Sequence, residues 1–208
     1  MTEVVLIPEK LKDQRSFRRW AQSADYPEHG WITYLRGKVW VDMSMERNVH
    51  NLIKTEIGAA LVLLARQRQL GRYWSDNMLF TNTTAQLSTE PDGMFATWKA
   101  LQDGRVKLLG GDDRTATEVF GSPEMVLEVV SPSSVRKDTS ELPSAYLRAG
   151  IAEYWLIDPR SSSLRFDILR ATASGYRRVR VVDGWRKSRV FGAEFRIVES
   201  TDPLGGTA

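Results

Sequence analysis

Regularly spaced apolar residues are most evident between Glu46 and Leu70. Seven of them recur at steps of three and four residues, the period of an amphipathic helix: Val49, Leu52, Ile53, Ile57, Ala60, Leu61 and Leu64. Gly71 follows the last turn and is expected to end the helix. A shorter pattern of the same period, around Phe17 and Trp20, predicts another helix over residues 13–25.

Short runs rich in β-branched and aromatic residues predict strands. Trp31–Leu35 and Lys38–Val41 flank Arg36-Gly37, which predicts a hairpin whose glycine supplies a positive φ. The composition farther along predicts short strands at 72–76 and 78–82, a helical turn at 98–103 and an exposed insertion at 104–118.

Residues 125–158 form the most compact predicted unit. Met125–Val130 is almost continuously apolar and predicts a strand covered on both faces. Thr139–Ala149 predicts a helix, capped near Thr139 or Ser140 and ended by Gly150. Glu153–Asp158 predicts a second buried strand, and the short return makes the two strands parallel neighbours in a right-handed crossover.

The remaining runs, at 164–169, 176–182 and 195–198, predict an antiparallel meander. The expected fold class is therefore α/β, a mixed sheet flanked by helices with an antiparallel C-terminal meander. We expect a single domain over residues 1–200 and a flexible tail over 201–208.

Composition excludes several classes of protein. The chain has 208 residues, 42% of them apolar and 26% charged, which is typical of a globular protein. It has no cysteine, so structural disulfides, thiolate metal sites and cysteine nucleophiles are excluded. Because no apolar run approaches the length of a membrane span and the start does not resemble a signal peptide, we expect a cytoplasmic protein without membrane contact.

Common catalytic and nucleotide-binding motifs are also missing from the sequence. It contains no GxxxxGK[ST], GxGxxG, HExxH or GxSxG pattern. Since His29 and His50 are the only histidines, a zinc site would need carboxylate ligands.

Positive charge is concentrated near the C-terminus. The net charge is +3, but residues 160–190 hold nine Lys or Arg against two Asp, a local balance of +7 that leaves −4 elsewhere. Such a surface attracts a polyanion and makes a set of cations candidates for nucleic-acid binding: Arg177, Arg178, Arg180, Arg186, Lys187 and Arg189. The same residues also fit strands that simply turn their charged side chains to solvent.

Two acids are the main candidates for chemistry. Glu128 interrupts the apolar strand 125–130, where a carboxylate is costly unless it is paired or bound to a cation. Asp92 lies in Pro91-Asp92-Gly93 at a break in a β-type run, although it also fits an ordinary turn. An aspartate and a glutamate on adjacent strands, without soft ligands, favour a hard ion such as Mg²⁺ or Mn²⁺.

Several segments together resemble a known family. They are EPDG at 90–93, MVLEVVSPSS at 125–134, Asp138, Tyr146, AGI at 149–151 and EYWLIDP at 153–159. These segments resemble the Uma-two family of putative endonucleases, in the restriction-endonuclease-like PD-(D/E)XK superfamily. The hairpin at 31–41 and the helix of His50 match as well, so the resemblance covers most of the chain. EYWLIDP after AGI is its most specific part, whereas Pro-Asp alone is not specific.

The resemblance implies roles for particular residues. Asp92 and Glu128 match the metal-binding acids of the motif, and the backbone carbonyl of Val129 would be a third ligand. The motif lysine falls at Val130, and the helical position that carries a lysine in many members is Leu142, so this chain departs from both patterns. Lys137 is the nearest cation and our candidate for orienting water or stabilising charge, although it also fits a solvent-exposed lysine.

Four more residues are candidates for contacting and positioning the groups that would bind the metal: Glu46, His50, Asp138 and Tyr146. Glu46 and His50 lie four apart on one helix face, which equally fits a surface ion pair. Tyr146 has the helical spacing of a core residue. Trp155, inside a buried strand, is expected in the core rather than stacked on a base.

The resulting hypothesis is a Mg²⁺- or Mn²⁺-dependent endonuclease that hydrolyses phosphodiester bonds in DNA. One alternative is a nuclease-fold module without catalysis that binds nucleic acid or a protein, motivated by the missing lysines. Another is a metal-dependent hydrolase of small phosphoesters. A homodimer is plausible by analogy with enzymes that cut both strands.

Overall fold

The computed structural model describes residues 7–9, 11–160, 164–198, 200 and 203. Apart from Pro203, the tail expected over 201–208 lies outside the described residues. Among the described helices, none has the length and apolar character needed to cross a membrane.

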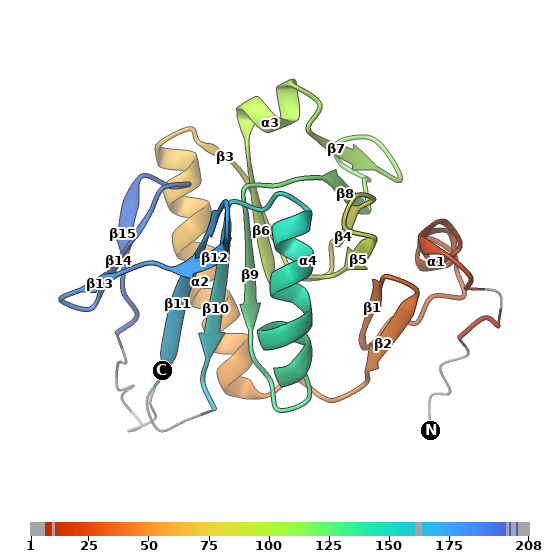
Figure 1. Cartoon of the computed structure of the whole chain (residues 1–208), viewed down its shortest axis with the longest axis horizontal. Helices are drawn as coiled ribbons and strands as arrows, with labels where there is room; N and C mark the ends of the chain where they lie inside the picture. The colour runs from red at the N-terminus through yellow and green to blue at the C-terminus, as the bar shows by residue number, and fades with distance from the viewer. Residues whose placement is uncertain (1–6, 10, 161–163, 199, 201–202, 204–208) are drawn as a thin grey trace.

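A mixed six-stranded sheet forms the centre of the molecule (Figure 1). Its strands, in spatial order, are β12 (Gly175–Arg178), β11 (Arg165–Thr172), β10 (Glu153–Asp158), β9 (Met125–Val129), β6 (Gly93–Thr97) and β3 (Gly71–Ser75). β9 and β10 are parallel neighbours, with Leu127 opposite Trp155, which confirms the predicted parallel pairing. β6 runs antiparallel to β9, so the segment that begins after Asp92 lies beside the strand of Glu128.

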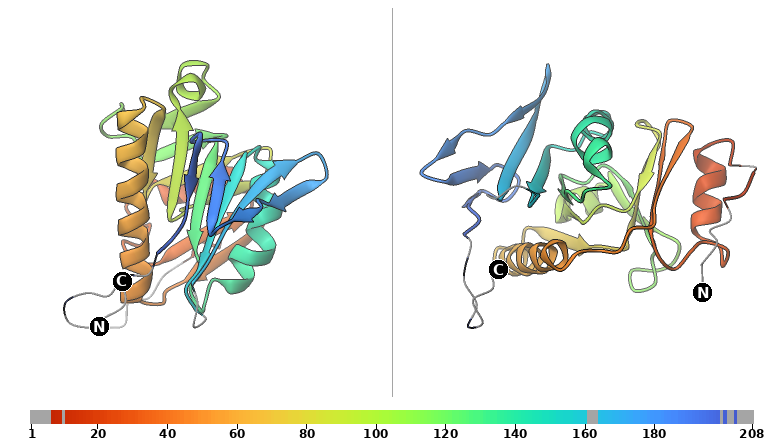
Figure 2. Two further views of the ribbon diagram at one scale, coloured as in Figure 1. Left: turned by 90° about the vertical axis from the view of Figure 1, so that its left-hand side faces the viewer. Right: turned by 90° about the horizontal axis from the view of Figure 1, so that it is seen from below.

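The two faces of β9 are covered by different elements, as its almost continuous apolar sequence requires. Val126 and Val130 face a core that includes α4 (Leu142–Arg148). Met125, Leu127 and Val129 face a core built with α2 (Asn48–Gln67) and the last strands of the chain. Figure 2 shows α2 and α4 on opposite sides of the sheet. The predicted α/β class with flanking helices is confirmed.

A second sheet packs beside the first and closes the α4 side of the core. Its order is β2 (Lys38–Asp42), β1 (Trp31–Leu35), β5 (Leu87–Thr89), β4 (Leu79–Asn82), β8 (Glu118–Gly121) and β7 (Val106–Leu109). The predicted hairpin forms, and Arg36 and Gly37 both have positive φ. The short helix α3 (Trp98–Gln102) follows β6 where a helical turn was predicted.

The N-terminal helix α1 (Gln14–Ala21) is fixed to this second sheet by charge as well as by apolar contact. Asp13 caps its first turn. The side chain of Arg18 donates two hydrogen bonds, of 2.7 and 2.8 Å, to the fully buried carboxylate of Glu118. Phe17 and Trp20 pack with residues of β1 and β4.

The structure corrects one predicted segment and adds detail to another, the antiparallel C-terminal meander. Residues 104–118 are not simply an exposed insertion, because they contain β7, which pairs with β8. The C-terminal meander is divided: β11 and β12 extend the central sheet, while β13 (Val181–Val182), β14 (Trp185–Ser188) and β15 (Ala193–Phe195) form a separate antiparallel sheet. Glu153 joins the two sheets, because its buried carboxylate accepts hydrogen bonds from Ser188 Oγ and Arg189 N.

Two helix ends also differ from the prediction. The left-handed residue after α2 is Gln69, at φ 53°, whereas Gly71 already belongs to β3. The helix before β10 begins with a π-helical turn at Lys137–Glu141, ahead of the predicted cap. Thr139 does not cap it, because its hydroxyl donates back to the carbonyl of Val135 at 2.6 Å.

Alanine is expected to have opposite effects at Gly58, inside α2, and at Gly71, the first residue of β3. A Cβ at Gly71 would lie 2.0 Å from the carbonyl oxygen of Ala96, so Gly71→Ala should destabilise the protein by about 1–3 kcal/mol. A Cβ at Gly58, inside α2, would lie 3.7 Å from Tyr73, an ordinary contact. Gly58→Ala should therefore raise the unfolding free energy by about 0.5–1 kcal/mol. Urea unfolding monitored by circular dichroism measures both, and equal effects would contradict this account.

Candidate active site

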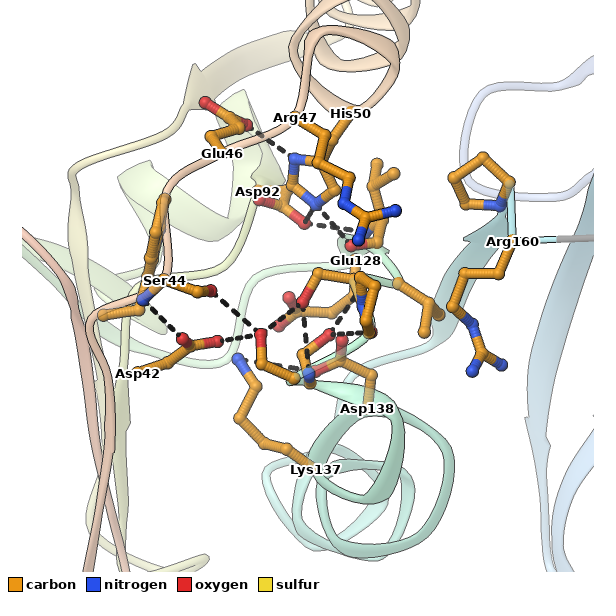
Figure 3. A pocket seen from close by; sticks show the side chains of 18 of the residues that line it. Asp42, Ser44, Glu46, Arg47, His50, Asp92, Glu128, Lys137, Asp138 and Arg160 are labelled. Carbon is orange, nitrogen blue, oxygen red and sulfur yellow. Dashed lines mark hydrogen bonds and ion pairs between the residues drawn. The ribbon is translucent and has the colours of Figure 1, made fainter.

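A cleft of about 260 Å³ opens where β9 and β10 end. Its walls come from segments far apart in the chain: the end of β2 and start of α2, the strand end at Asp92, the turn after β9 with the π-helical turn, and Pro159-Arg160 after β10 (Figure 3). The carboxyl ends of parallel strands meet here, which is where open α/β sheets commonly place their ligands.

Asp92 and Glu128 come together in this cleft from neighbouring strands. Gly93, the residue after Asp92, pairs with Leu127, the residue before Glu128. Asp92 Oδ2 accepts a hydrogen bond of 2.6 Å from the backbone N–H of Val129. Glu128 Oε1 accepts one of 2.5 Å from the hydroxyl of Tyr146 on α4. The two side chains are almost fully buried, with exposures of 7% for Asp92 and 2% for Glu128.

Burial makes both acids hard to ionise. Desolvation raises the pKa of Asp92 to about 6, although His50, the Val129 N–H and Lys54 all favour the charged form. Desolvation also raises the pKa of Glu128 well above its ordinary value, with a smaller contribution from neighbouring Asp138 and Asp92, while Lys137 opposes the shift. The positive groups around the cleft are therefore too few to keep both acids ionised at their ordinary pKa values, a situation that a bound cation would reverse.

Lys137 enters the cleft from the π-helical turn. Its side chain is 14% exposed, and its ammonium lies 3.4 Å from Oδ1 of Asp138, an atom that is buried and accepts no hydrogen bond from any described residue. Burial disfavours the charged ammonium, but the nearby carboxylates of Glu128, Asp138 and Asp92 outweigh it and raise the pKa of Lys137. Lys137 therefore remains protonated. Desolvation raises the pKa of Asp138 in turn.

His50 connects α2 to the backbone of β9. Its Nδ1 contacts Glu46 Oε1 at 2.5 Å, and its Nε2 contacts the carbonyl oxygen of Val129 at 2.5 Å and lies 3.7 Å from Asp92 Oδ2. Glu46 Oε1 and the Val129 carbonyl oxygen are both acceptors, so the two ring nitrogens of His50 link the start of α2 to the end of β9. His50 therefore lies at the same strand end as Asp92.

Lys54, one turn after His50 on α2, adds a buried positive charge next to Glu46 and Asp92. Its buried ammonium pairs with Glu46 and Asp76 and lies 3.8 Å from Asp92 Oδ1. Lys54 was not among the residues to which the sequence pointed. Glu46 and His50 line the cleft, and Glu46 also pairs with buried Lys54, so their contact is not an isolated surface pair.

The side-chain oxygen atoms of the cleft could bind a hard divalent ion only if backbone, water or substrate completed its coordination. Within the described part of the chain, no three Asp, Glu or His side chains converge to enclose a metal by themselves. Asp92, Glu128 and the carbonyl of Val129 offer oxygen atoms of the type that Mg²⁺ and Mn²⁺ prefer. Because the pKa values of both acids are raised, a cation would relieve an existing electrostatic cost.

Several residues of the cleft carried no recognisable sequence signal. Asp42 Oδ2 accepts a hydrogen bond of 2.6 Å from Ser133, which ties the second sheet to the turn after β9. Arg47 and Arg160 stand on the rim, from the start of α2 and the end of β10 (Figure 3). Arg160 directly follows the EYWLIDP segment and Arg47 lies between Glu46 and His50, but only the folded chain brings the two arginines to one cleft.

The candidate basic residues lie elsewhere. None of Arg177, Arg178, Arg180, Arg186, Lys187 and Arg189 lines the cleft. Arg178 pairs with Asp167 at 2.7 Å, and Arg186 lies over the ring of Phe166 at 5.0 Å. Trp155 is fully buried among Phe166, Phe191 and Phe195, as expected for a core residue.

Comparisons with known proteins agree with this geometry. The family model Uma2, described as "Putative restriction endonuclease", matches residues 16–198. Among solved structures, the chain is similar to a protein from Anabaena variabilis described as a putative nuclease belonging to DUF820. The two share 18% identity at a TM-score of 0.58, over 77% of this chain and 83% of that one. No functionally curated protein matches the chain at a significant level.

The raised pKa of Asp92 predicts a pH dependence of stability. The pKa of about 6 in the folded protein exceeds the ordinary value of 3.8, so the folded state binds this proton more tightly than the unfolded chain. Proton binding at Asp92 therefore contributes fully to the free energy of unfolding below pH 3.8, and this contribution is lost as the pH rises through 6. In the presence of a chelator, Asp92→Asn should abolish this pH dependence. At neutral pH the free energy of unfolding of the variant should then be about 2–3 kcal/mol higher than that of the wild type. Urea titrations at several pH values measure it. Asp103→Asn, at a half-exposed surface aspartate, is the control and should parallel wild type; an identical pH profile for Asp92→Asn would contradict the argument.

Proposed function

We propose that this chain, which belongs to the Uma2 family of putative restriction endonucleases, is a divalent-metal-dependent endonuclease that hydrolyses phosphodiester bonds in DNA. One observation carries the proposal: two buried acids from adjacent strands share a cleft with a charged lysine. Family membership supports a nuclease, while the metal and the DNA substrate are inferred from the chemistry of the cleft.

In this proposal Asp92 and Glu128 hold Mg²⁺ or Mn²⁺, together with the carbonyl of Val129. The bound ion would supply Lewis acidity and charge neutralisation for attack on phosphorus. Tyr146 fixes one oxygen of Glu128, and the Val129 N–H fixes one oxygen of Asp92, so each acid retains a second oxygen for a ligand. His50 holds the Val129 carbonyl in place.

Lys137 takes the place of the family's lysine in this proposal. Val130 and Leu142, the two positions where a lysine was expected, are buried among apolar residues and have no room for a charge. Because its neighbours keep Lys137 protonated, its role is to stabilise the negative charge that develops on the phosphoryl oxygens rather than to remove a proton from water. Asp138 positions the ammonium.

The alternative, a nuclease-fold module that only binds nucleic acid or protein, rests on the same missing lysines. It gives no reason for Lys137 to be held next to three buried carboxylates, an arrangement that is costly in the absence of a function. We further propose that the exposed cations among Arg177, Arg178, Arg180, Arg186, Lys187 and Arg189 contact DNA backbone outside the cleft.

Activity should depend on the acids and on the lysine in different degrees. Asp92→Asn and Glu128→Gln should abolish Mg²⁺- or Mn²⁺-dependent cleavage of plasmid and oligonucleotide DNA. Lys137→Met should lower kcat by about 10²–10³-fold, and Lys137→Arg should recover part of it because the charge is kept. Lys99→Met, at an exposed lysine paired with Asp103, is the matched control and should retain full activity. Unchanged cleavage by clean preparations of both acid variants would overturn the proposal.

Metal binding can be tested without catalysis. Added Mg²⁺ or Mn²⁺ should raise the Tm of the wild-type protein, because a ligand that binds only the folded state stabilises it by mass action. Asp92→Asn and Glu128→Gln should each lose this shift, whereas Lys137→Met should keep it. Isothermal titration calorimetry supplies the stoichiometry, and an equal shift in all variants would show that the ion binds elsewhere.

A further inference from the structure

The acids of the cleft are recessed from the protein surface. Exposure is 7% for Asp92, 2% for Glu128 and 1% for Asp138. The cleft above them holds about 260 Å³, below the range of roughly 300–1,000 Å³ that is usual for small-molecule pockets. A volume of this size is that of part of one nucleotide rather than of a base pair. A strand that is free to bend can bring a phosphodiester to such recessed acids more readily than a strand held in a duplex.

Three apolar side chains are exposed at the rim of the cleft. The chain between β2 and α2 exposes Met43 at 43% and Met45 at 93%, and the first turn of α2 exposes Val49 at 44%. Met45 and Val49 also line the cleft itself. The flat face of a nucleobase can cover such side chains, but in a stacked duplex those faces are already covered by neighbouring bases.

Within this segment Arg47 carries a positive charge, while the neighbouring Glu46 is paired with His50 and Lys54. Arg47 stands between Met45 and Val49 at the start of α2, where its side chain does not cap the helix, and it has no ion-pair partner among the described residues. Figure 3 shows Arg47 on the same side of the cleft as His50, with Lys137 reaching in from the opposite side. Cations that flank apolar contacts complement a single strand, whose phosphates and base faces alternate.

We propose that the substrate is DNA in an unpaired state, and that Met43–Val49, here called the lip, binds the nucleotide next to the scissile phosphate. Arg47 pairs with its phosphate, and Met45 and Val49 contact its base. This rests on the proposed nuclease function and adds strand preference to it. Unpairing costs free energy in a duplex and little in a single strand, so the preference follows from the depth of the acids.

Binding can be measured without cleavage by using Asp92→Asn protein in the presence of Ca²⁺ or a chelator. Fluorescence anisotropy should show that a labelled single-stranded oligonucleotide, or a duplex with an unpaired internal loop, binds about tenfold more tightly, or better, than the fully paired duplex. Equal or tighter binding of the paired duplex would overturn the inference. This measurement remains valid even if no DNA is cleaved, so failure of the nuclease proposal and failure of the strand preference are distinguishable.

The lip is tested in the same Asp92→Asn background. Met45→Ala combined with Val49→Ala should weaken single-strand binding by about three- to tenfold and leave duplex binding unchanged. Arg47→Ala should reduce the slope of log affinity against log salt by about 0.7. Leu63→Ala and Arg66→Ala are matched controls, because both residues are exposed on α2 remote from the cleft, and they should change neither quantity.

A second copy of this chain is the competing occupant of the lip. Sedimentation velocity of the wild type and of the Met45→Ala, Val49→Ala double variant distinguishes the two. A dimer that the double variant converts to monomer, with single-strand affinity unchanged, would assign the lip to self-association and overturn the proposal. An oligomeric state common to both proteins, together with the loss of single-strand affinity, would support it.

Discussion

Two carboxylates kept out of water at the end of a central strand are the constraint on which the rest of the cleft depends. Glu128 and Asp92 cannot lie side by side at low dielectric without charged or donating partners. Those partners come from separate elements: a tyrosine from α4, a lysine from the π-helical turn and an imidazole from α2. The packing of these helices on the sheet is thus also an electrostatic requirement, since each delivers one compensating group to the same place.

The sequence singles out Glu128 because it violates a local rule, whereas Asp92 also fits an ordinary turn and gains its weight from the family resemblance. Glu128 is a charge within an apolar run, and the strand around it forms as predicted, with its alternate residues on two different cores. Helix α2, the hairpin and the parallel β9–β10 pair were also predictable, because their periodicity and turn residues are local signals. β7 was hidden, since Val106–Leu109 is short and lies among Gly, Asp and Arg, and only pairing with β8 makes it a strand.

The compensating groups were harder to find, for a physical reason. Lys137 was chosen only as the nearest cation, and nothing local indicates that it is buried beside Asp138. Lys54 has no local sequence signal, because Asp76 and Asp92 come close to it only in the folded chain. Asp42, at the end of β2, and Arg47, at the start of α2, reach the cleft only through the packing of these elements around the central sheet. Partners of a buried charge are selected by three-dimensional proximity, so one residue of a pair predicts the need for the other but not its identity.

The π-helical turn at Lys137–Glu141 has a consequence for how such a site changes over time. A π-helical turn accommodates one residue more than an α-helical turn, and such insertions are frequent at functional sites. Each residue of a helix advances about 100° around the axis, so loss of one residue from this turn would swing Lys137 away from the acids while leaving α4 and its core contacts in register. A single-residue insertion or deletion here would therefore move the Lys137 ammonium relative to Asp92 and Glu128 without disturbing the sheet, whereas the pairing of β6 with β9 fixes the two acids.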